Sequence, residues 1–471
     1  MEDRDFIIKD IDTLALACGG KIIKKGKLPF SGKISTDSRN LSKNSVFIAL
    51  KGENFDGHDF IKDALKNDIS GIIAEKDFEL LTKNFEQISF ISVGNSIQAL
   101  GQIANYKRKK AAIKIFGITG SVGKTSTRQI LKSILSQKFK VHGPLKNFNN
   151  HIGVPLTILD IAKEHDFAVI EMGMSSKGEI EYLSKIALPD IAIITKIAPA
   201  HIEYFENIEE IAKEKASITK GMKKDSFVII NEEDKILEKY MKDINVLKFG
   251  FNKDSDLFIT NMKLENSYTM AEFNINTRSI KEKFAVKINI PGKTMIKNAA
   301  GAALCAAVYG ISPDEIAKGI LDYKGTNGRF FTIHDLKKDI FIIDDTYNAN
   351  PESLKASAAD FAHIKKSSRG FAVIGDMLEL GKNSMTYHIK AGELLGKLDL
   401  DGIFAYGSFA ENIINGAKNS ADKKTILYKG SHKQISDELL KILQPGDYVL
   451  VKGSRGSKME TIIENLTQKT E

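Results

Sequence analysis

The chain has 471 residues, of which 42% are hydrophobic and 27% are charged. About 150 residues per domain predicts three domains, since one hydrophobic core rarely serves a longer chain. Basic residues exceed acidic ones by 68 − 60 = 8, but both kinds are interspersed, so we expect no nucleic-acid binding. No apolar leader or run of roughly 18 apolar residues is present, which favours a cytoplasmic protein without a membrane span. Two distant cysteines argue against a disulfide framework.

The first segment, residues 1–110, alternates short apolar runs with helical stretches. Its predicted strands are Val46–Leu50, Gly71–Ala74 and Ile88–Val93. A helical stretch, His58–Lys66, separates the first two strands. The segment closes on the sequence KRKK at residues 107–110, which we interpret as a solvated helix end. A small N-terminal α/β domain is therefore predicted.

The second segment, residues 111–324, alternates between strand and helix patterns. Its predicted strands are Ile113–Ile118, Phe167–Met172, Asp190–Ile197 and Ser226–Asn231. Its predicted helices start at Thr125 or span Glu179–Ala187 and Ile208–Thr219. A β-like stretch, Leu257–Ile290, follows, and an alanine-rich helix, Met295–Tyr309, is expected to close the domain. Such alternation predicts a parallel sheet covered by helices.

The third segment, residues 325–471, starts after a predicted hinge at Asp322–Arg329, where glycines interrupt the helical pattern. Its predicted strands are Ile340–Asp344, Phe371–Ile374, Ile403–Tyr406 and Tyr448–Val451. Each strand is followed by a helical run, which predicts a C-terminal Rossmann-like open α/β sheet.

A glycine-rich loop, GITGSVGKT at residues 117–125, lies between a predicted strand and a predicted helix. In such a phosphate-binding loop (P-loop), backbone amides face phosphate oxygens. Lys124 can reach the β- and γ-phosphates, and the Thr125 hydroxyl can bind Mg²⁺. The common P-loop has glycine where this chain has Ile118. A glycine-rich turn without a ligand is the alternative interpretation.

The variant spacing of this loop resembles the ATP loop of the Mur ligase family and of its folylpolyglutamate synthetase relatives. Further motifs are NFNNHIGVPLT at 147–157, EMGM at 171–174, AHIE at 200–203, DDTYNANP at 344–351, GDMLELG at 375–381 and KGSRG at 452–456. Their order and spacing resemble those in the members of this family that join D-alanyl-D-alanine to UDP-N-acetylmuramoyl-tripeptide. The resemblance runs through all three segments and implies a monomeric three-domain enzyme whose central domain is a P-loop ATPase.

The resemblance implies that ATP converts a peptide carboxylate into an acyl phosphate, which an amine then captures. Two alternatives stay open. The preceding ligase of the family adds the third amino acid, but its usual Asp-Asn-Pro-Arg signature is absent from this sequence. A P-loop NTPase acting as a switch would need neither Asn147–Asn150 nor Lys452–Arg455.

The nucleotide site implied by the resemblance draws on the central and C-terminal segments. Its residues are Gly120, Ser121, Val122, Gly123, Lys124, Thr125, Ser126, Asn298, Arg329, Asp345 and Tyr347. The catalytic residues so implied are Lys124, Lys215, His201 and Arg329. ATP would bridge the two domains, and their closure would exclude water from the acyl phosphate. Thr294 stands where histidine is more usual.

Two Mg²⁺ ions are implied, because several anionic oxygens meet in the reaction. Their expected protein ligands are Thr125, Glu171, His201 and Lys215. Glu171 ends a predicted strand, at the edge where open α/β sheets bind ligands. Lys215 resembles the family's carbamylated lysine, with Lys213 as the competing candidate. Lys196, Ala198, Pro199 and Ser217 depart from the family pattern near these ligands.

The substrate sites are also implied by the resemblance. Ser35, Thr36, Asp37, Ser38 and Arg39, with Lys51–His58 downstream, resemble the uridine-diphosphate end. Without the resemblance, that segment would be an ordinary polar turn. Asn147, Asn149 and Asn150 resemble residues that face the muramyl-peptide. The expected dipeptide-binding residues are Asn348, Asn350, Lys452, Ser454 and Arg455. A basic loop that only caps a strand is the alternative for the last three residues.

Overall fold

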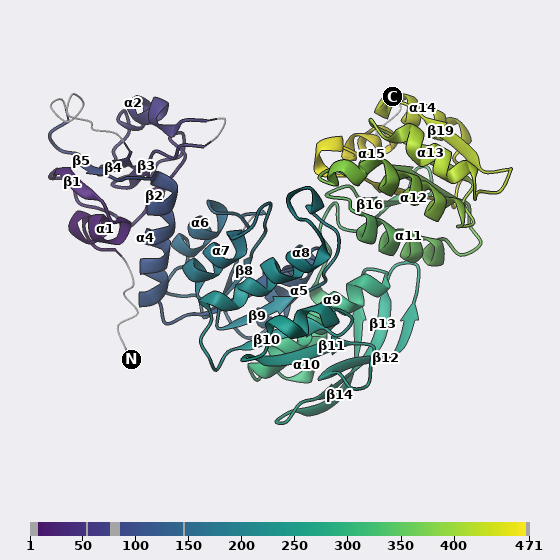
Figure 1. Ribbon diagram of the computed structural model, residues 1–471, viewed down its shortest axis with the longest axis horizontal. Coiled ribbons are helices and arrows are strands. Elements are labelled where there is room, and N and C mark those ends of the chain that lie inside the picture. The colour runs from purple at the N-terminus through teal and green to yellow at the C-terminus, as the bar shows by residue number, and fades with distance from the viewer. Residues whose placement is uncertain (1–7, 53–54, 76–84, 145–146, 468–471) are drawn as a thin grey trace.

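A computed structural model describes residues 8–52, 55–75, 85–144 and 147–467. Within these ranges the strands form three sheets, one in each successive part of the chain. Figure 1 shows the parts as three lobes in a row, with the central lobe between the N-terminal and C-terminal ones. The predicted α/β class with three domains is confirmed. No helix in the described ranges is long and apolar enough to cross a membrane.

The N-terminal sheet has the strand order β1-β5-β4-β3-β2. Its strands are β1 (Lys21–Lys24), β2 (Ile34–Ser35), β3 (Val46–Ile48), β4 (Gly71–Ala74) and β5 (Ser89–Ser92). The helices α1 (Ile11–Cys18) and α4 (Ser96–Lys110) cover one face, and α2 (Ile61–Ala64) packs against the other. The expected helix His58–Lys66 is shorter, because a 3₁₀ turn (Gly57–Phe60) precedes α2.

The basic end of α4 fixes the N-terminal domain to the central one. Lys107 Nζ donates hydrogen bonds to the carbonyls of Leu159 (2.5 Å) and Ile161 (2.7 Å). Arg108 is only 8% exposed, and its Nη2 pairs with Asp190 Oδ2 at 2.8 Å. The interpretation as a solvated helix end was therefore wrong for these two residues. The reason is that long cationic side chains can satisfy carbonyls of a neighbouring domain.

The central sheet has the strand order β14-β13-β12-β11-β10-β9-β6-β8-β7. Strand β13 pairs antiparallel with both of its neighbours, β12 and β14. The strands are β6 (Lys114–Thr119), β7 (Val141–His142), β8 (Phe167–Glu171), β9 (Ile191–Ile194), β10 (Phe227–Asn231), β11 (Asn245–Gly250), β12 (Leu257–Leu264), β13 (Thr269–Asn276) and β14 (Lys281–Ile288). The near-continuous apolar runs of β6, β8, β9 and β10 suit parallel strands that are buried on both faces.

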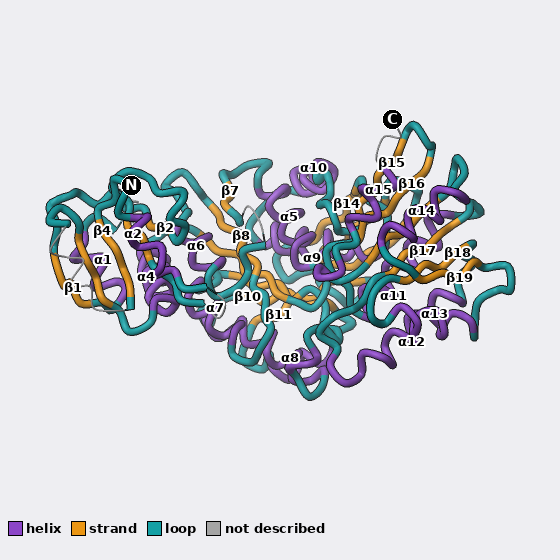
Figure 2. Tube along the Cα trace, turned by 90° about the horizontal axis from the view of Figure 1, so that it is seen from above, coloured by secondary structure: helices purple, strands orange, loops and turns teal. Residues whose placement is uncertain are grey.

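Helices pack on both faces of this sheet, as the tube view in Figure 2 shows. One face carries α5 (Lys124–Leu135), α9 (Lys293–Val308) and α10 (Pro313–Asp322). The other carries α6 (Gly153–Leu159), α7 (Glu179–Ala187) and α8 (Ile208–Ala216). The expected helix Ile208–Thr219 ends at Ala216 and continues as a 3₁₀ turn, Ser217–Gly221. Helix α10 was not predicted, although Ser312 and Glu315 form a capping box at its start.

The C-terminal sheet has the strand order β15-β16-β20-β17-β18-β19, and only its edge strand β15 is antiparallel within the described residues. The strands are β15 (Phe331–Asp335), β16 (Ile340–Asp345), β17 (Gly370–Ile374), β18 (Gly402–Ala405), β19 (Ile426–Lys429) and β20 (Tyr448–Lys452). The helices are α11 (Pro351–Lys365), α12 (Ser384–Gly396), α13 (Ala410–Lys418), α14 (His432–Ile442) and α15 (Glu460–Thr467). The four predicted strands are present, whereas β15 and β19 were not predicted.

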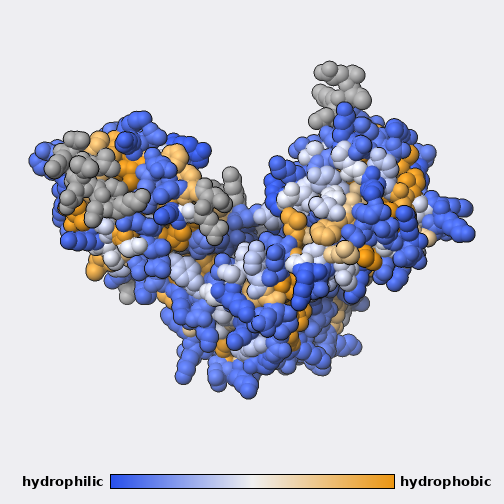
Figure 3. Space-filling view, turned by 45° about the horizontal axis from the view of Figure 1, so that its top comes forward, coloured by the Kyte–Doolittle hydropathy of each residue, from blue (hydrophilic) through white to orange (hydrophobic). Residues whose placement is uncertain are grey.

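The candidate site lies at strand ends of the central and C-terminal sheets. In the space-filling view of Figure 3, a broad hollow separates the N-terminal and C-terminal lobes above the central one. The carboxyl ends of β6, β8 and β16 carry the P-loop, Glu171 and Asp345. Open α/β sheets bind ligands at these strand ends.

Candidate functional site

The P-loop connects β6 to α5 and contains two glycines that the surrounding structure requires. Gly120 has φ +144°, and a Cβ added there would lie 2.0 Å from Thr195 Oγ1. Gly123 has φ +91°, and a Cβ added there would lie 2.4 Å from Asn298 Oδ1. Both positions therefore need glycine. The second contact also places Asn298 of α9, a predicted nucleotide-binding residue, against the loop.

Two of the residues that depart from the family pattern, Lys196 and Ala198, hold the loop through their backbone. Ser121 N donates to the Lys196 carbonyl at 2.6 Å, and Ser121 Oγ donates to the Ala198 carbonyl at 2.9 Å. Lys196 Nζ is in turn paired with Asp234 Oδ1 at 3.0 Å. Because carbonyls make the contacts with Ser121, they do not depend on which side chains occupy positions 196 and 198.

Glu171, the last residue of β8, is 2% exposed and is the centre of a polar cluster. Thr125 Oγ1 donates to its Oε2 at 2.9 Å, and Asn149 Nδ2 donates to its Oε1 at 3.0 Å. Arg128 Nε lies 3.4 Å from Oε2. The structure thus brings together two predicted oxygen ligands of a cation, the Thr125 hydroxyl and the Glu171 carboxylate. Arg128, which sequence reasoning missed, lies on the same face of α5 as Thr125.

Two lysines lie close to this cluster. Lys124 Nζ donates to the Gly120 carbonyl at 2.8 Å, and burial lowers the pKa of Lys124. Lys215 is only 1% exposed, and its pKa lies well below the usual range because of burial and then because of the nearby Lys124. Lys213, the competing candidate, is exposed on the outer side of the same helix. Of the two lysines, the structure places Lys215 beside the P-loop.

His201 lies at the start of a 3₁₀ turn, Ile202–Tyr204. Its Nδ1 forms an ion pair with Glu379 Oε2 of the C-terminal domain. Sequence reasoning missed Glu379, although it belongs to the GDMLELG motif at residues 375–381. No group of three or more His, Cys, Asp or Glu side chains that could hold a metal occurs in the described parts of the chain. Any cation here would therefore need hydroxyl, modified lysine or substrate oxygens in addition.

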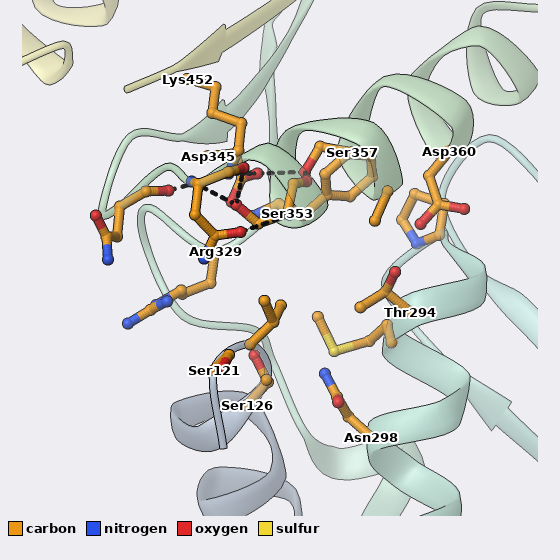
Figure 4. A pocket seen from close by; sticks show the side chains of 18 residues that line it. Ser121, Ser126, Thr294, Asn298, Arg329, Asp345, Ser353, Ser357, Asp360 and Lys452 are labelled. Atoms are coloured by element: carbon orange, nitrogen blue, oxygen red, sulfur yellow. Dashed lines mark hydrogen bonds and ion pairs between the residues drawn. The ribbon is translucent and has the colours of Figure 1, made fainter. Parts of the chain in front are cut away.

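A pocket lies between the P-loop and the C-terminal domain, and Figure 4 shows its lining. The lining residues are Ser121, Val122, Gly123, Ser126, Pro291, Thr294, Met295, Asn298, Arg329, Phe330, Asp345, Asn348, Asn350, Ser353, Ala356, Ser357, Asp360 and Lys452. The P-loop residues lie at one end and Asp360 at the other, as Figure 4 shows. The pocket thus contains seven of the predicted nucleotide-binding residues: Ser121, Val122, Gly123, Ser126, Asn298, Arg329 and Asp345.

Arg329, in the predicted hinge, joins the two sides of this pocket. Its Nη2 donates to Thr125 Oγ1 at 3.3 Å, and its guanidinium lies 3.9 Å from the centre of the Tyr347 ring. Asn147 Nδ2 in turn contacts the Tyr347 hydroxyl. Four predicted site residues are therefore in contact: Thr125 and Asn147 of the central domain, Arg329 of the hinge and Tyr347 of the C-terminal domain. Asp360, which sequence reasoning missed, also crosses the domain boundary, since its Oδ1 accepts from Lys293 N at 2.9 Å.

The predicted dipeptide-binding residues divide into buried and exposed ones. Lys452 is 1% exposed, and its Nζ donates to Asp345 Oδ2 at 2.6 Å and to the Asn348 carbonyl at 3.0 Å. Asn350 Oδ1 caps α11 by accepting from Ser353 N at 2.8 Å. Lys452 therefore belongs to the nucleotide pocket and does not project from a basic loop.

Ser454 and Arg455 follow β20 at the edge of the C-terminal domain. Ser454 is buried, and its Oγ donates to the Ala349 carbonyl at 3.3 Å. The Arg455 side chain is 66% exposed and pairs with Glu460 Oε1 at 2.9 Å. Of the predicted cations in this loop, Arg455 is the one that faces solvent.

The predicted uridine-diphosphate segment lies in the N-terminal domain, separate from the pocket. Asp37 accepts from both Arg39 Nε (2.9 Å) and Arg39 Nη2 (2.8 Å), and this pairing lowers the pKa of Asp37 to about 2. Ser35 Oγ donates to the Asp37 carbonyl at 3.2 Å, and Thr36 and Ser38 are half-buried in the same turn. Ser35 also lines a groove between this domain and the α6–β8 connection, together with Asn40, Ser42 and Lys107.

The fold and the site together define a nucleotide-dependent enzyme, and comparison with known families identifies the class. The Mur ligase family catalytic domain matches residues 32–108, the Mur ligase middle domain matches 118–306, and the Mur ligase glutamate ligase domain matches 328–455. The chain belongs to the Mur ligase family.

Within this family, the following three relatives match more than nine tenths of this chain. The UDP-N-acetylmuramoyl-tripeptide–D-alanyl-D-alanine ligase of Bacillus subtilis is 33% identical over 92% of this chain and 93% of its own length. Among solved structures, MurF from Acinetobacter baumannii has a TM-score of 0.87 and 30% identity, over 98% of this chain and 99% of that one. The MurF ligase from Thermotoga maritima in complex with ADP has a TM-score of 0.81 and 32% identity, over 92% and 97%.

Proposed function

We propose that this chain is an ATP-dependent ligase that joins D-alanyl-D-alanine to UDP-N-acetylmuramoyl-tripeptide. The observation that carries the proposal is the meeting of Lys124, Arg329 and the Thr125–Glu171 pair at one point of the domain boundary. Cations fixed at that point suit the transfer of a γ-phosphoryl group onto a carboxylate. The acceptor and the nucleotide substrate are those in the names of the full-length relatives.

The nucleotide binds between the central and C-terminal domains in this proposal. Its phosphates lie on the backbone amides of residues 120–126, at the N-terminus of α5. Asn298, Arg329, Asp345 and Tyr347 approach it from α9, the hinge and the C-terminal domain. The contact of Arg329 with both Thr125 and Tyr347 supports this placement, since one side chain links both halves of the site.

The Thr125 hydroxyl and the Glu171 carboxylate fit a Mg²⁺ ion, because both are hard oxygen donors and lie 2.9 Å apart. When bound, Mg²⁺ neutralises phosphate and acyl oxygens. We propose His201 as a ligand of a second ion. Its pairing with Glu379 supports a histidine held in one orientation, which is common for metal-binding histidines.

We propose that Lys215 carries a carbamate. The support is its burial and the lowered pKa that burial and Lys124 cause, since a neutral amine reacts with CO₂ and an ammonium does not. The modification would turn a buried cation into an anionic oxygen donor. An exposed lysine such as Lys213 lacks this reason to be neutral.

The chemistry then runs through an acyl phosphate. The peptide carboxylate attacks the γ-phosphorus of ATP and ADP leaves; the amine of the dipeptide attacks the acyl carbon, and phosphate leaves as the amide forms. Lys124 and Arg329 stabilise the charge of the transferred group. Domain closure keeps water from the acyl phosphate.

The substrates come to the site from both outer domains. Residues 1–110 bind the uridine diphosphate through Ser35–Arg39, residues 111–324 bind ATP, and residues 325–471 bind the dipeptide. Asn147, Asn149 and Asn150 face the muramyl-peptide. Asn348, Asn350, Ser454 and Arg455 bind the dipeptide, and the exposed guanidinium of Arg455 suits its carboxylate. The monomeric state and the cytoplasmic location stay predictions.

One assay tests the proposal. With ATP and UDP-N-acetylmuramoyl-tripeptide present, phosphate release should require D-alanyl-D-alanine and be weak with free D-alanine, whose carboxylate lies too close to the reacting amine. Turnover with the dipeptide nucleotide and lysine or diaminopimelate would instead identify the preceding ligase of the family. ATP hydrolysis that needs no carboxylate and no amine would identify an NTPase switch.

A further inference from the structure

The segment Asp376–Gly381 of the C-terminal domain connects two parts of the proposed site that belong to different domains. It follows β17 and ends on a short 3₁₀ turn, Gly381–Asn383. One end of the segment contacts the loop after β20, and the other contacts the His201 turn of the central domain.

The first end is fixed within the C-terminal domain. Leu378 N donates to Ser454 Oγ at 2.9 Å, and Ser454 N donates to the Asp376 carbonyl at 3.0 Å. Met377 N donates to Nε2 of His388 at 2.9 Å, and His388 is fully buried. These bonds make the segment a rigid extension of the loop that carries Ser454.

The second end crosses to the central domain. Glu379 Oε2 pairs with His201 Nδ1, and the Glu379 carbonyl accepts from Glu203 N at 3.2 Å. Ile202, between these two central-domain residues, packs against the hydrophobic cores of both domains. The contact thus combines an ion pair, a backbone hydrogen bond and apolar packing.

Both residues of the ion pair have a left-handed backbone conformation, which residues other than glycine seldom adopt. His201 has φ +59° and Glu379 has φ +62°. A non-glycine residue in this region costs on the order of 1–3 kcal/mol and persists where its surroundings over-determine it, often at functional sites. Two such residues in contact across a domain boundary are the observation that singles out this pair.

We propose that Glu379 is a positioning residue for His201, so that docking of the C-terminal domain fixes the histidine ring. This rests on the proposed function only for the role of His201 as a metal ligand. In this proposal, the Glu379 carboxylate beside Nδ1 favours the tautomer with its proton on Nδ1, which would leave the Nε2 lone pair to bind a metal. Because the same segment is bonded to Ser454, docking that fixes the histidine ring also fixes the position of the proposed dipeptide-binding loop relative to it.

The first test measures docking without any substrate. Spin labels on Lys224→Cys and Lys433→Cys report the distance between the two domains, and the native Cys18 and Cys305 are buried. Glu379→Ala should broaden this distance distribution or shift it to longer values. Glu203→Gln is the matched control. It also removes one negative charge close to His201, but the Glu203 side chain is exposed. An unchanged distribution in Glu379→Ala overturns the proposed docking.

The second test reads the ring itself. In protein labelled with ¹⁵N-histidine, the His201 signal, assigned by its loss in His201→Gln, should report the Nδ1–H form in the wild type. Glu379→Ala should convert it to a mixture of tautomers. Glu379→Gln keeps an acceptor and should retain more of the wild-type signal. A His201 spectrum that is the same in Glu379→Ala overturns the positioning role.

The third test asks whether positioning matters to turnover. Glu379→Ala should lower kcat about tenfold or more, as for residues that orient a metal ligand, with KM for ATP little changed. Equal losses in Glu379→Ala and Glu203→Gln overturn the proposal. The distance and tautomer measurements need no substrate, so their failure is distinct from failure of the proposed function, which the acceptor assay detects.

Discussion

Thr125 Oγ1 lies 2.9 Å from Glu171 Oε2, joining the first turn of the P-loop helix to the end of β8. The carboxylate faces the Arg128 guanidinium as well as the Thr125 hydroxyl. Glu171→Gln keeps the shape of the side chain but removes its charge. The Mg²⁺ concentration for half-maximal activity should rise at least about tenfold, or about 1.4 kcal/mol. A titration of activity with Mg²⁺ measures this, and the exposed Glu206→Gln is the control.

Lys124→Ala should lower kcat by several orders of magnitude, because the transition state loses a fixed cation beside the transferred phosphoryl group. Lys124 lies in the first turn of α5, and the hydrogen bond of its Nζ goes to the Gly120 carbonyl of its own loop, so folding should change little. Steady-state kinetics and circular dichroism measure the two effects. A variant that keeps more than about a tenth of the wild-type rate, a loss below ~1.4 kcal/mol, contradicts the role. Lys140→Ala, at an exposed position, is the control.

Lys215→Ala should abolish metal-dependent activity, because the variant lacks the buried amine whose carbamate supplies an oxygen donor to the metal. Added acetate or another small carboxylate should restore part of the activity by taking the place of the carbamate. Lys213→Ala, on the exposed side of the same helix, should stay close to the wild type. Near-normal activity of Lys215→Ala without a carboxylate would show that the carbamate assignment is wrong.

The pH dependence of stability gives an independent test of the buried Lys215 amine. Burial holds its folded pKa well below the ordinary 10.5, so between these two values the unfolded chain binds more protons than the folded one. In buffer free of CO₂, resistance to urea should therefore rise as the pH increases from 7 towards 10. Lys215→Met should weaken that rise, and Lys213→Met should not. Equal slopes in the wild type and Lys215→Met would contradict an unmodified amine held neutral by burial.

Arg455→Ala should mainly raise KM for D-alanyl-D-alanine, by about 1.5–3 kcal/mol, which is typical of a hydrogen bond to a charged group. The guanidinium is exposed and held by Glu460 alone among the described residues, so its removal should not disturb the core. Initial rates against dipeptide concentration measure the effect, with Lys433→Ala on α14 as the control. An unchanged KM would assign the dipeptide carboxylate to another group.

The predicted segments with strong local patterns match the structure closely. Apolar runs gave the positions of β4 and β16, and the 3.6-residue periodicity gave α7 at its observed bounds, Glu179–Ala187. Elements with a weaker pattern were missed, among them the edge strand β15 and the half-buried strand β19. Edge strands bury less apolar surface than central ones, so their sequences carry less periodic signal.

The sequence by itself determined the class of fold, the P-loop and the family, because these depend on local periodicity and on motifs whose residues are contiguous. Only the tertiary structure decided which of Lys213 and Lys215 is buried, and that Lys452 pairs with Asp345 in the nucleotide pocket. It also decided that His201 meets Glu379 across the domain boundary. Contacts between residues more than a hundred positions apart follow from how whole domains pack, and no local pattern in either segment specifies them.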